Sequence, residues 1–141
     1  MSDLLDDAHA RAGLDLLEAN AALTVFDGVV DSPTPDPPFV LVYTTVEWLS
    51  GPDAMANSLD HLSETCRVTW VCHCVGLTAA ASRAVVMQVR SSLLDQRPVI
   101  AGRVCGLISQ TDVQAPVRDE TTGRLVMDTV VTYELLTAPG A

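Results

Sequence analysis

Four cysteines have the strongest potential for chemistry, and three of them lie with a histidine in one stretch, Cys66-x5-Cys72-His73-Cys74. Zinc knuckles use Cys-x-x-Cys spacing, in which a tight turn aims two thiolates at one ion. The alternating pattern of this stretch instead predicts a strand, on which Cys72 and Cys74 share a face about 6.5 Å apart while His73 points away. One such strand does not chelate an ion, and Cys105 could complete a site only from a neighbouring strand. We therefore expect reduced, structural thiols and no metal.

Nucleophilic catalysis needs a histidine within reach of an activated serine, threonine or cysteine. The chain has three histidines, His9, His61 and His73, and none lies in a recognisable nucleophile motif. The stretch Asp60-His61-x-x-Glu64 could act in acid–base chemistry or bind a metal, but an exposed polar loop is the commoner explanation. We predict no catalytic residues and no cofactor.

Composition excludes further functions. The 141 residues include 18 acidic and 8 basic side chains, the basic ones all arginine, for a net charge of -10. The lack of lysine excludes P-loop and Schiff-base mechanisms, and an acidic chain with six aromatic residues is poorly suited to gripping nucleic acid. The hydrophobic fraction of 48% and mean hydropathy of +0.28 argue against disorder and indicate surface that a partner or sister subunit covers.

The negative charge is concentrated in the N-terminal part of the chain. Residues 1–60 hold eleven acids against Arg11, whereas residues 61–141 hold seven acids and seven arginines. The acidic start does not predict a secretory signal. The longest charge-free run, 15 residues over 68–82, is too short and too polar to span a bilayer. We expect synthesis in the cytoplasm and no membrane contact.

Length and periodicity predict one α+β domain over residues 1–141, with a single mixed or antiparallel sheet of four to five strands and two helices packed on one face. Helices are expected over 3–20 and from the N-cap Thr78 to about residue 94. The buried stripe of the first is expected to be Leu5, Ala8, Ala12, Leu16 and Ala19. Strands are expected over 23–30, 39–46, 66–75, 99–112 (with bulges at Gly102 and Gly106) and from residue 125 onward.

Three polar stretches separate these elements. Residues 31–38 are rich in proline and predict a stiff, extended loop; its aspartates could bind a cation, but a solvated turn is the simpler interpretation. Residues 117–124 predict a turn. Residues 47–64 predict a long irregular loop with candidate interface residues Trp48, Gly51, Pro52 and Met55. Trp48 is either an interface anchor or a lid over the chain's own core.

The predicted strand over 39–46 is apolar on both faces. Phe39, Leu41 and Tyr43 alternate with Val40, Val42 and Val46. Such a strand is covered on both sides, on one by the helices. The other face, with Phe39, Leu41 and Tyr43, is either covered within the chain or packed against a sister subunit.

Four stretches of the sequence are distinctive when taken together. The first is an N-terminal helix that leads into VFDGVVDSPTPDPPFVLVYTT (25–45). The others are VTWVCHCVGLT (68–78), SRAVVMQVRSSLLDQRPVIAGRV (82–104), and Ala115-Pro-Val-Arg-Asp-Glu120 before a last strand that carries Tyr133. In these stretches the chain resembles, end to end, the tail terminator proteins of long, non-contractile-tailed bacteriophages, particularly phages of actinobacteria.

The resemblance implies a structural virion protein without catalytic activity. Such proteins form a homohexameric ring on the head-proximal end of the tail tube, stop tube polymerisation and present the surface that docks head completion or neck proteins. Genome DNA passes through the ring without specific binding, which fits an acidic chain without lysine. We expect the tube and neck contacts in the 47–64 and 115–124 segments, the second with Arg118, Asp119, Glu120 and Arg124.

Two alternatives stay open. A head–tail connector or neck protein beneath the portal is similarly small and ring-forming, but a more helical chain is expected of the adaptor type. A small dimeric α+β enzyme or ligand-binding domain would use the 60–64 segment, and a saturable effect of a small molecule or metal on its stability would favour it.

Overall fold

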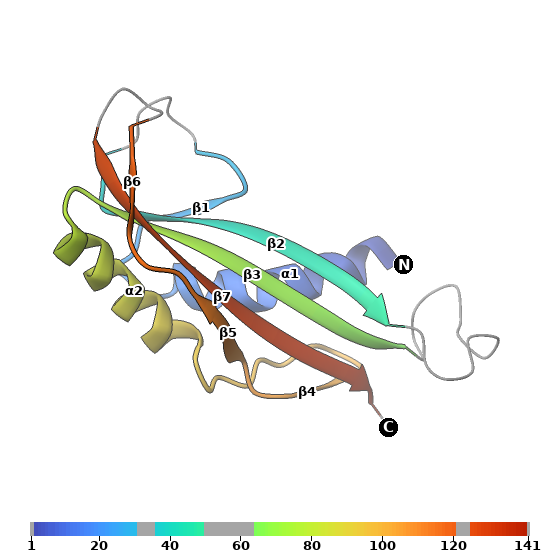
Figure 1. Ribbon diagram of the computed structural model, residues 1–141. Helices are drawn as coiled ribbons and strands as arrows, with labels where there is room; N and C mark the ends of the chain where they lie inside the picture. Colours follow the sequence, from blue (N-terminus) through green and yellow to red (C-terminus); the bar gives the residue numbers. More distant parts are fainter. Residues whose placement is uncertain (1, 31–35, 50–63, 121–124, 141) are drawn as a thin grey trace.

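The computed structural model describes residues 2–30, 36–49, 64–120 and 125–140, and Figure 1 shows their arrangement. The elements are α1 (Ser2–Glu18), β1 (Val25–Asp27), β2 (Phe39–Leu49), β3 (Thr65–Gly76), α2 (Ala79–Leu93), β4 (Arg103–Cys105), β5 (Ser109–Val113), β6 (Val117–Asp119) and β7 (Val126–Pro139). The α+β class is confirmed, with both helices on one face of a mixed sheet. Within the described residues the sheet has seven strands, so the predicted number of four to five was too low.

Three long strands form the centre of the sheet. β3 lies between β2 and β7 and is antiparallel to both, while β1 adds to β2 in parallel at one edge. β-Branched and aromatic residues dominate these strands and suit a pleated, half-buried surface. β2 continues to Leu49, so Trp48 lies in a strand opposite Cys66. The prediction of an irregular loop from residue 47 was wrong there; residues 50–63 lie outside the described part of the chain.

The other edge of β7 is covered by three short strands in succession. β4 pairs with its end, β5 with its middle and β6 with its start. The register shifts by one residue at each step, from Cys105↔Thr137 to Ser109↔Glu134, again within β5, and on to Val117↔Asp128. Each extra residue bends the covering segment and increases its twist, which lets it follow the twisted β7.

The short strands along this edge of β7 account for the difference between the predicted and the observed number of strands. The single strand predicted over 99–112 is split into β4 and β5, and the predicted turn from Val117 begins as β6. Gly106 lies at the first break, as predicted, and its N–H donates to the carbonyl oxygen of Leu136 at 2.9 Å. Backbone hydrogen bonds to β7 hold this segment, and a hydropathy pattern does not reveal them.

The main core lies between the helices and one face of the sheet. Alternate residues of β3 are buried there: Cys66, Val68, Trp70, Cys72 and Cys74. The facing helices contribute Leu14, Leu17, Val85, Val89 and Leu93. The predicted alternation of β3 is therefore confirmed, because side chains on a strand repeat every two residues.

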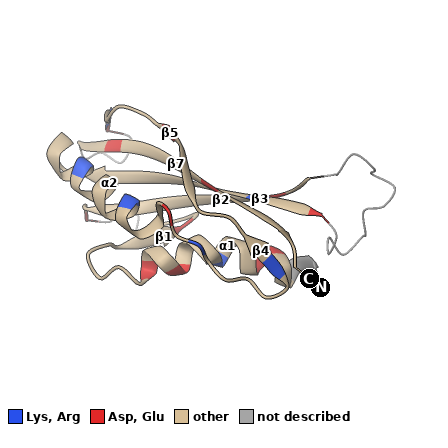
Figure 2. Cartoon of the chain, turned by 90° about the horizontal axis from the view of Figure 1, so that it is seen from below, with Lys and Arg blue, Asp and Glu red and all other residues tan. Residues whose placement is uncertain are grey.

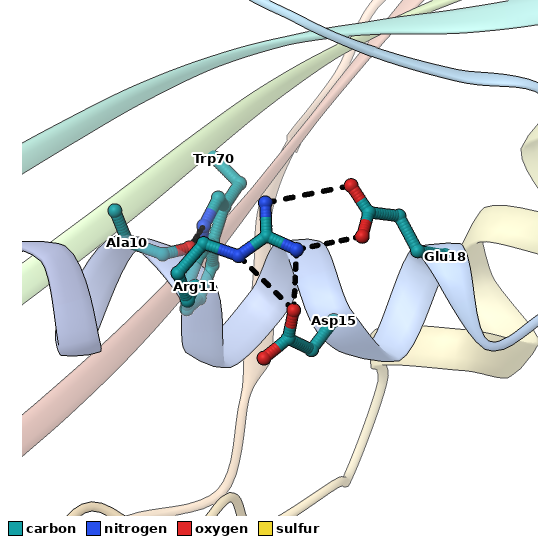
Figure 3. Close-up of polar contacts among 5 residues, drawn as sticks. All are labelled: Ala10, Arg11, Asp15, Glu18 and Trp70. Carbon is teal, nitrogen blue, oxygen red and sulfur yellow. Dashed lines mark hydrogen bonds and ion pairs between the residues drawn. The ribbon is translucent and has the colours of Figure 1, made fainter.

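The buried face of α1 differs from the predicted stripe. His9, Gly13, Leu14 and Leu17 are buried, whereas Leu5, Ala8, Ala12 and Leu16 are only partly buried and Ala19 is exposed beyond the helix. Gly13 allows the helix to approach the indole of Trp70, because a Cβ there would stand 2.7 Å from Cδ2 and from Cζ2 of that ring. The Trp70 indole N–H donates to the Ala10 carbonyl at 3.2 Å, as Figure 3 shows. The prediction from hydropathy missed this face because a hydropathy scale does not rank glycine or histidine as core residues.

The start of α2 follows the prediction. The Thr78 hydroxyl accepts a hydrogen bond from the Ala81 N–H at 3.1 Å, which satisfies one of the free donors at the helix N-terminus. Ser82 in the first turn is buried and bonds to the Cys74 carbonyl at 2.6 Å and to the Thr129 hydroxyl at 2.7 Å. These bonds attach the helix to β3 and β7.

Candidate functional site

The cysteines contribute to the core and are not placed for chemistry. All four are free and buried. Burial raises the pKa of the Cys66 and Cys72 thiols to about 12, and it also raises the pKa of Cys74 and Cys105. A thiol in its protonated form is neither a nucleophile nor a metal ligand. Over residues 2–30, 36–49, 64–120 and 125–140, no group of three His, Cys, Asp or Glu side chains is placed to hold a metal ion.

Polar side chains meet at the end of the sheet where β2 ends and β3 begins. The buried His9 ring donates from Nδ1 to the Leu5 carbonyl at 2.7 Å, and its Nε2 lies 2.8 Å from the Thr137 hydroxyl. Arg103 donates from Nε to the same hydroxyl at 3.2 Å. Burial lowers the pKa of the His9 imidazole below its ordinary value, so the ring is neutral at neutral pH. Its one proton is on Nδ1, so Nε2 accepts the hydrogen bond that the Thr137 hydroxyl donates.

Trp48 joins this group from β2. Its indole N–H donates to Asp6 Oδ1 at 2.7 Å, and its ring meets His9 edge to face with 5.2 Å between centroids. The Arg103 guanidinium lies 5.3 Å from the Trp48 ring centroid and donates to the Glu64 carbonyl at 2.6 Å. These contacts make Trp48 a lid over its own chain, and they hold α1, β4 and the ends of β2 and β3 together. Its role at an interface stays a prediction.

Sequence reasoning did not find Asp6 and Arg103, because no local motif links residues so far apart in the chain. Of the other predicted residues in this region, Gly51, Pro52, Met55, Asp60 and His61 lie outside the described residues. Glu64 is buried, so its side chain is not part of an exposed polar loop as expected. Arg103 donates a hydrogen bond to the backbone carbonyl of Glu64.

The sheet face opposite the helices is covered at one end by the chain itself. Phe39, Val75 and Val126 form a second cluster there with Phe26, and the two phenylalanine rings meet edge to face at 5.5 Å. Phe39 thus finds its packing partner within the chain. In the part of the chain that the structure describes, no helix covers the rest of this face.

Leu41 and Tyr43 follow Phe39 on this open face. Leu41 is half-buried and Tyr43 is 46% exposed. The Tyr43 ring stands edge-on to His73 at 5.4 Å, and Nδ1 of His73 lies 2.8 Å from Oδ2 of Asp128. The resulting surface combines an apolar centre with charged neighbours, which suits a protein contact.

The edge formed by β4, β5 and β6 is also open. All five residues of β5 are exposed, and among the described strands none pairs with the outer side of this edge. Exposed apolar side chains line it: Val104, Leu107, Val113 and Val117, with Leu136 on β7 beside them. An exposed sheet edge with apolar side chains is a favourable site for association.

The predicted residues at the end of this edge form a charged group in which Arg118 and Glu120 are exposed and Asp119 is partly buried. Arg118 donates to Glu120 at 2.9 Å, and Asp119 pairs opposite Val126 at the start of β7. Arg124 lies outside the described residues. Sequence reasoning missed the apolar row because Val104, Leu107 and Val113 do not alternate regularly once the strand is bulged.

No described helix combines the length and apolar character needed to cross a membrane.

The described residues define the class of this protein as an α+β fold whose sheet is covered by two helices on one face and largely open on the other. No family model and no curated protein matches the chain. Solved structures do, with 21 matching chains. One belongs to a structure described as the virion of a native gene transfer agent particle, and it matches with a TM-score of 0.67 and 15% identity over 92% of this chain and 93% of that chain. At this identity the likeness establishes a shared fold over nearly the whole of both chains.

Proposed function

We propose that the protein is a structural subunit of a phage-like virion, and specifically a tail terminator that forms a hexameric ring on the head-proximal end of the tail tube. The observation that carries this proposal is the fold shared with a chain of the gene transfer agent virion over 92% of this chain. The sequence resemblance to tail terminators of non-contractile phage tails points to the same class of protein.

The open surfaces support an assembling subunit. A ring subunit contacts a copy of itself on two different sides, so it needs two separate association surfaces. The sheet face at Leu41 and Tyr43 and the apolar edge along β4, β5 and β6 are two such surfaces. Phe39, the third residue predicted for the first surface, packs within the chain in the second hydrophobic cluster.

The proposed contacts to the tail tube and to the neck or head completion protein lie in the 47–64 and 115–124 segments. The first contains Gly51, Pro52 and Met55 beside Trp48, and the second contains the charged group from Arg118 to Arg124. Both segments follow or precede long strands, so both are held by the sheet at their ends. The net charge of -10 favours passage of DNA without binding, because like charges repel.

The strand-rich architecture also favours a terminator over an adaptor-type connector, for which a more helical chain is expected. The described residues form seven strands and two helices. No cofactor is part of the proposal.

Native mass spectrometry with negative-stain imaging tests the proposal, first on the protein alone and then after mixing with tail-tube subunits. Hexameric rings, or rings that cap tubes and halt their growth, are the expected result. A discrete dimer that does not bind tubes would refute it and favour a small dimeric enzyme or ligand-binding domain.

Reversal of charge at Arg118 and Arg124, with Arg97→Glu as the matched control, is expected to impair tail joining. Normal joining and length in that variant would refute the assignment of the 115–124 segment.

A further inference from the structure

The two helices that cover the sheet carry opposite charge. α1 contains five acids and one arginine, whereas α2 contains two arginines and no acid. Figure 2 shows the acids of α1 in red and the arginines of α2 in blue. The chain therefore has an acidic helix and a basic helix in one layer, although its overall charge is strongly negative.

The arginines of α2 lie on the side of the helix that faces away from α1. Asn20, just after α1, donates to the side chains of Gln88 and Ser92, so that side of α2 faces α1. Arg83 and Arg90 are seven residues apart and therefore lie within about 20° of each other around the helix axis. The helical angle between this pair and the Gln88–Ser92 side is about 170° at 3.6 residues per turn.

These two arginines have no ionic partner within the described residues, unlike three other arginines of the chain. Arg11 pairs with Asp15 and Glu18, Arg67 with Glu47 and Glu134, and Arg118 with Glu120. Between Arg83 and Arg90 lies Met87, whose side chain is 69% exposed. We call Arg83, Met87 and Arg90 the basic stripe.

The exposed side of α1 has the complementary composition. Asp7, Asp15 and Glu18 are exposed, and Leu4 is 73% exposed. Arg11 neutralises part of this charge by binding Asp15 and Glu18, as Figure 3 shows, and leaves a net negative surface. We call Leu4, Asp7, Asp15 and Glu18 the acidic face.

The two helices lie beside each other on one face of the sheet. α1 packs beside β2, towards the β1 edge, whereas α2 packs on β3 and β7, towards the opposite edge. A head-to-tail arrangement in which the free side of α2 in one copy meets the exposed side of α1 in the next brings the basic stripe to the acidic face. A head-to-tail contact of this kind generates a closed ring when the rotation between neighbours closes.

We propose that the basic stripe of each copy docks on the acidic face of α1 in the next copy, with Met87 and Leu4 as the apolar part of the contact. This proposal rests on the ring proposed above. The occupant is a second copy of this chain because the chain itself supplies both complementary surfaces. Complementary charge steers such an encounter and fixes its register.

Two variants test the contact, each made in the full chain. Arg83→Glu with Arg90→Glu makes the stripe on α2 acidic. Asp7→Arg with Glu18→Gln changes the net charge of the acidic face, counted with Arg11, from -2 to +1, while Asp15 keeps its contact with Arg11. Each variant alone is expected to need at least about tenfold more protein for half-maximal ring assembly, because like charges then meet at every contact. Mixed in equal amounts, they are expected to assemble again as an alternating ring with an even number of subunits.

Arg97→Glu is the matched control, since Arg97 is also exposed and without an ionic partner among the described residues but lies beyond α2. Thermal melting by circular dichroism checks that each variant folds. If the wild-type protein forms no rings, the ring proposal fails and this one with it. If the wild type forms rings and Arg83→Glu/Arg90→Glu assembles as readily as Arg97→Glu, the helix contact is refuted while the ring stands. A variant that loses duplex DNA binding but assembles normally would equally refute the contact and assign the stripe to nucleic acid.

Discussion

Replacing Gly13 by alanine tests whether α1 is held at its observed distance from the sheet. The new Cβ would stand 2.7 Å from Cδ2 and Cζ2 of Trp70, whereas carbon atoms in contact prefer about 3.5–4.0 Å. The Trp70 side chain is fully buried and has no space to rotate. The helix must therefore move outward by about 1 Å, away from the ring.

The expected cost follows from three contributions. Overpacking of this kind costs about 1–3 kcal/mol, and lengthening the 3.2 Å hydrogen bond from Trp70 to Ala10 costs about 1 kcal/mol more. Alanine returns about 1 kcal/mol through its higher helix propensity. The net expectation is a loss of about 1–3 kcal/mol in the free energy of unfolding.

Urea unfolding at one fixed protein concentration, followed by far-ultraviolet circular dichroism, measures this loss. Ala84→Gly on the exposed side of α2 is the control, since it reports helix propensity without a packing change. Trp70→Leu removes the indole atoms that the new Cβ would meet, so Gly13→Ala is expected to be neutral or stabilising in that background. A destabilisation that stays the same with and without Trp70, within about 0.5 kcal/mol, would refute the steric reasoning.

Three further predictions follow from the core and from α2. The cysteine thiols are expected to resist a disulfide reagent in the native protein and to react fully after denaturation, because burial keeps them protonated; rapid labelling of the native chain would contradict this. The pKa of His9 is lowered in the folded state from its ordinary value of 6.5, so the unfolded chain binds the proton more readily and stability is lost as pH falls below that value. As the pH is lowered from about 7.5 to 5, the free energy of unfolding should fall more steeply for the wild type than for His9→Gln. The two slopes should differ by up to about 1.4 kcal/mol per pH unit, and equal slopes would exclude His9 as the cause. Thr78→Ala should cost about 1 kcal/mol and Thr78→Ser much less, a difference that disappears if the cap does not stabilise α2.

Some elements were predictable because one of their faces is buried by a large apolar surface. β3 alternates between buried cysteines, valine and tryptophan and more exposed residues such as Arg67 and His73, and α2 repeats its valines every four residues. Burial on one face imposes a period of two on a strand and of 3.6 on a helix, so these patterns are visible in the residues themselves.

Other features depend on contacts between distant residues. Gly13 is buried because Trp70 lies against it, and His9 is buried because Thr137 supplies its hydrogen bond. β5 is exposed along its whole length, so no hydrophobic period marks it as a strand.

The sequence by itself determined the α+β class, the two-faced helices and strands, the absence of lysine and the uneven charge, since each depends only on residue type and spacing. Only the tertiary structure decided how the edge of β7 is divided among three strands, that Trp48 closes over Asp6, His9 and Arg103, and that the acidic and basic helices lie towards opposite edges of the sheet. Each of these arises when backbone groups or charged side chains from separate segments meet in space. The hydropathy of a local stretch of sequence carries no information about which distant groups come into contact.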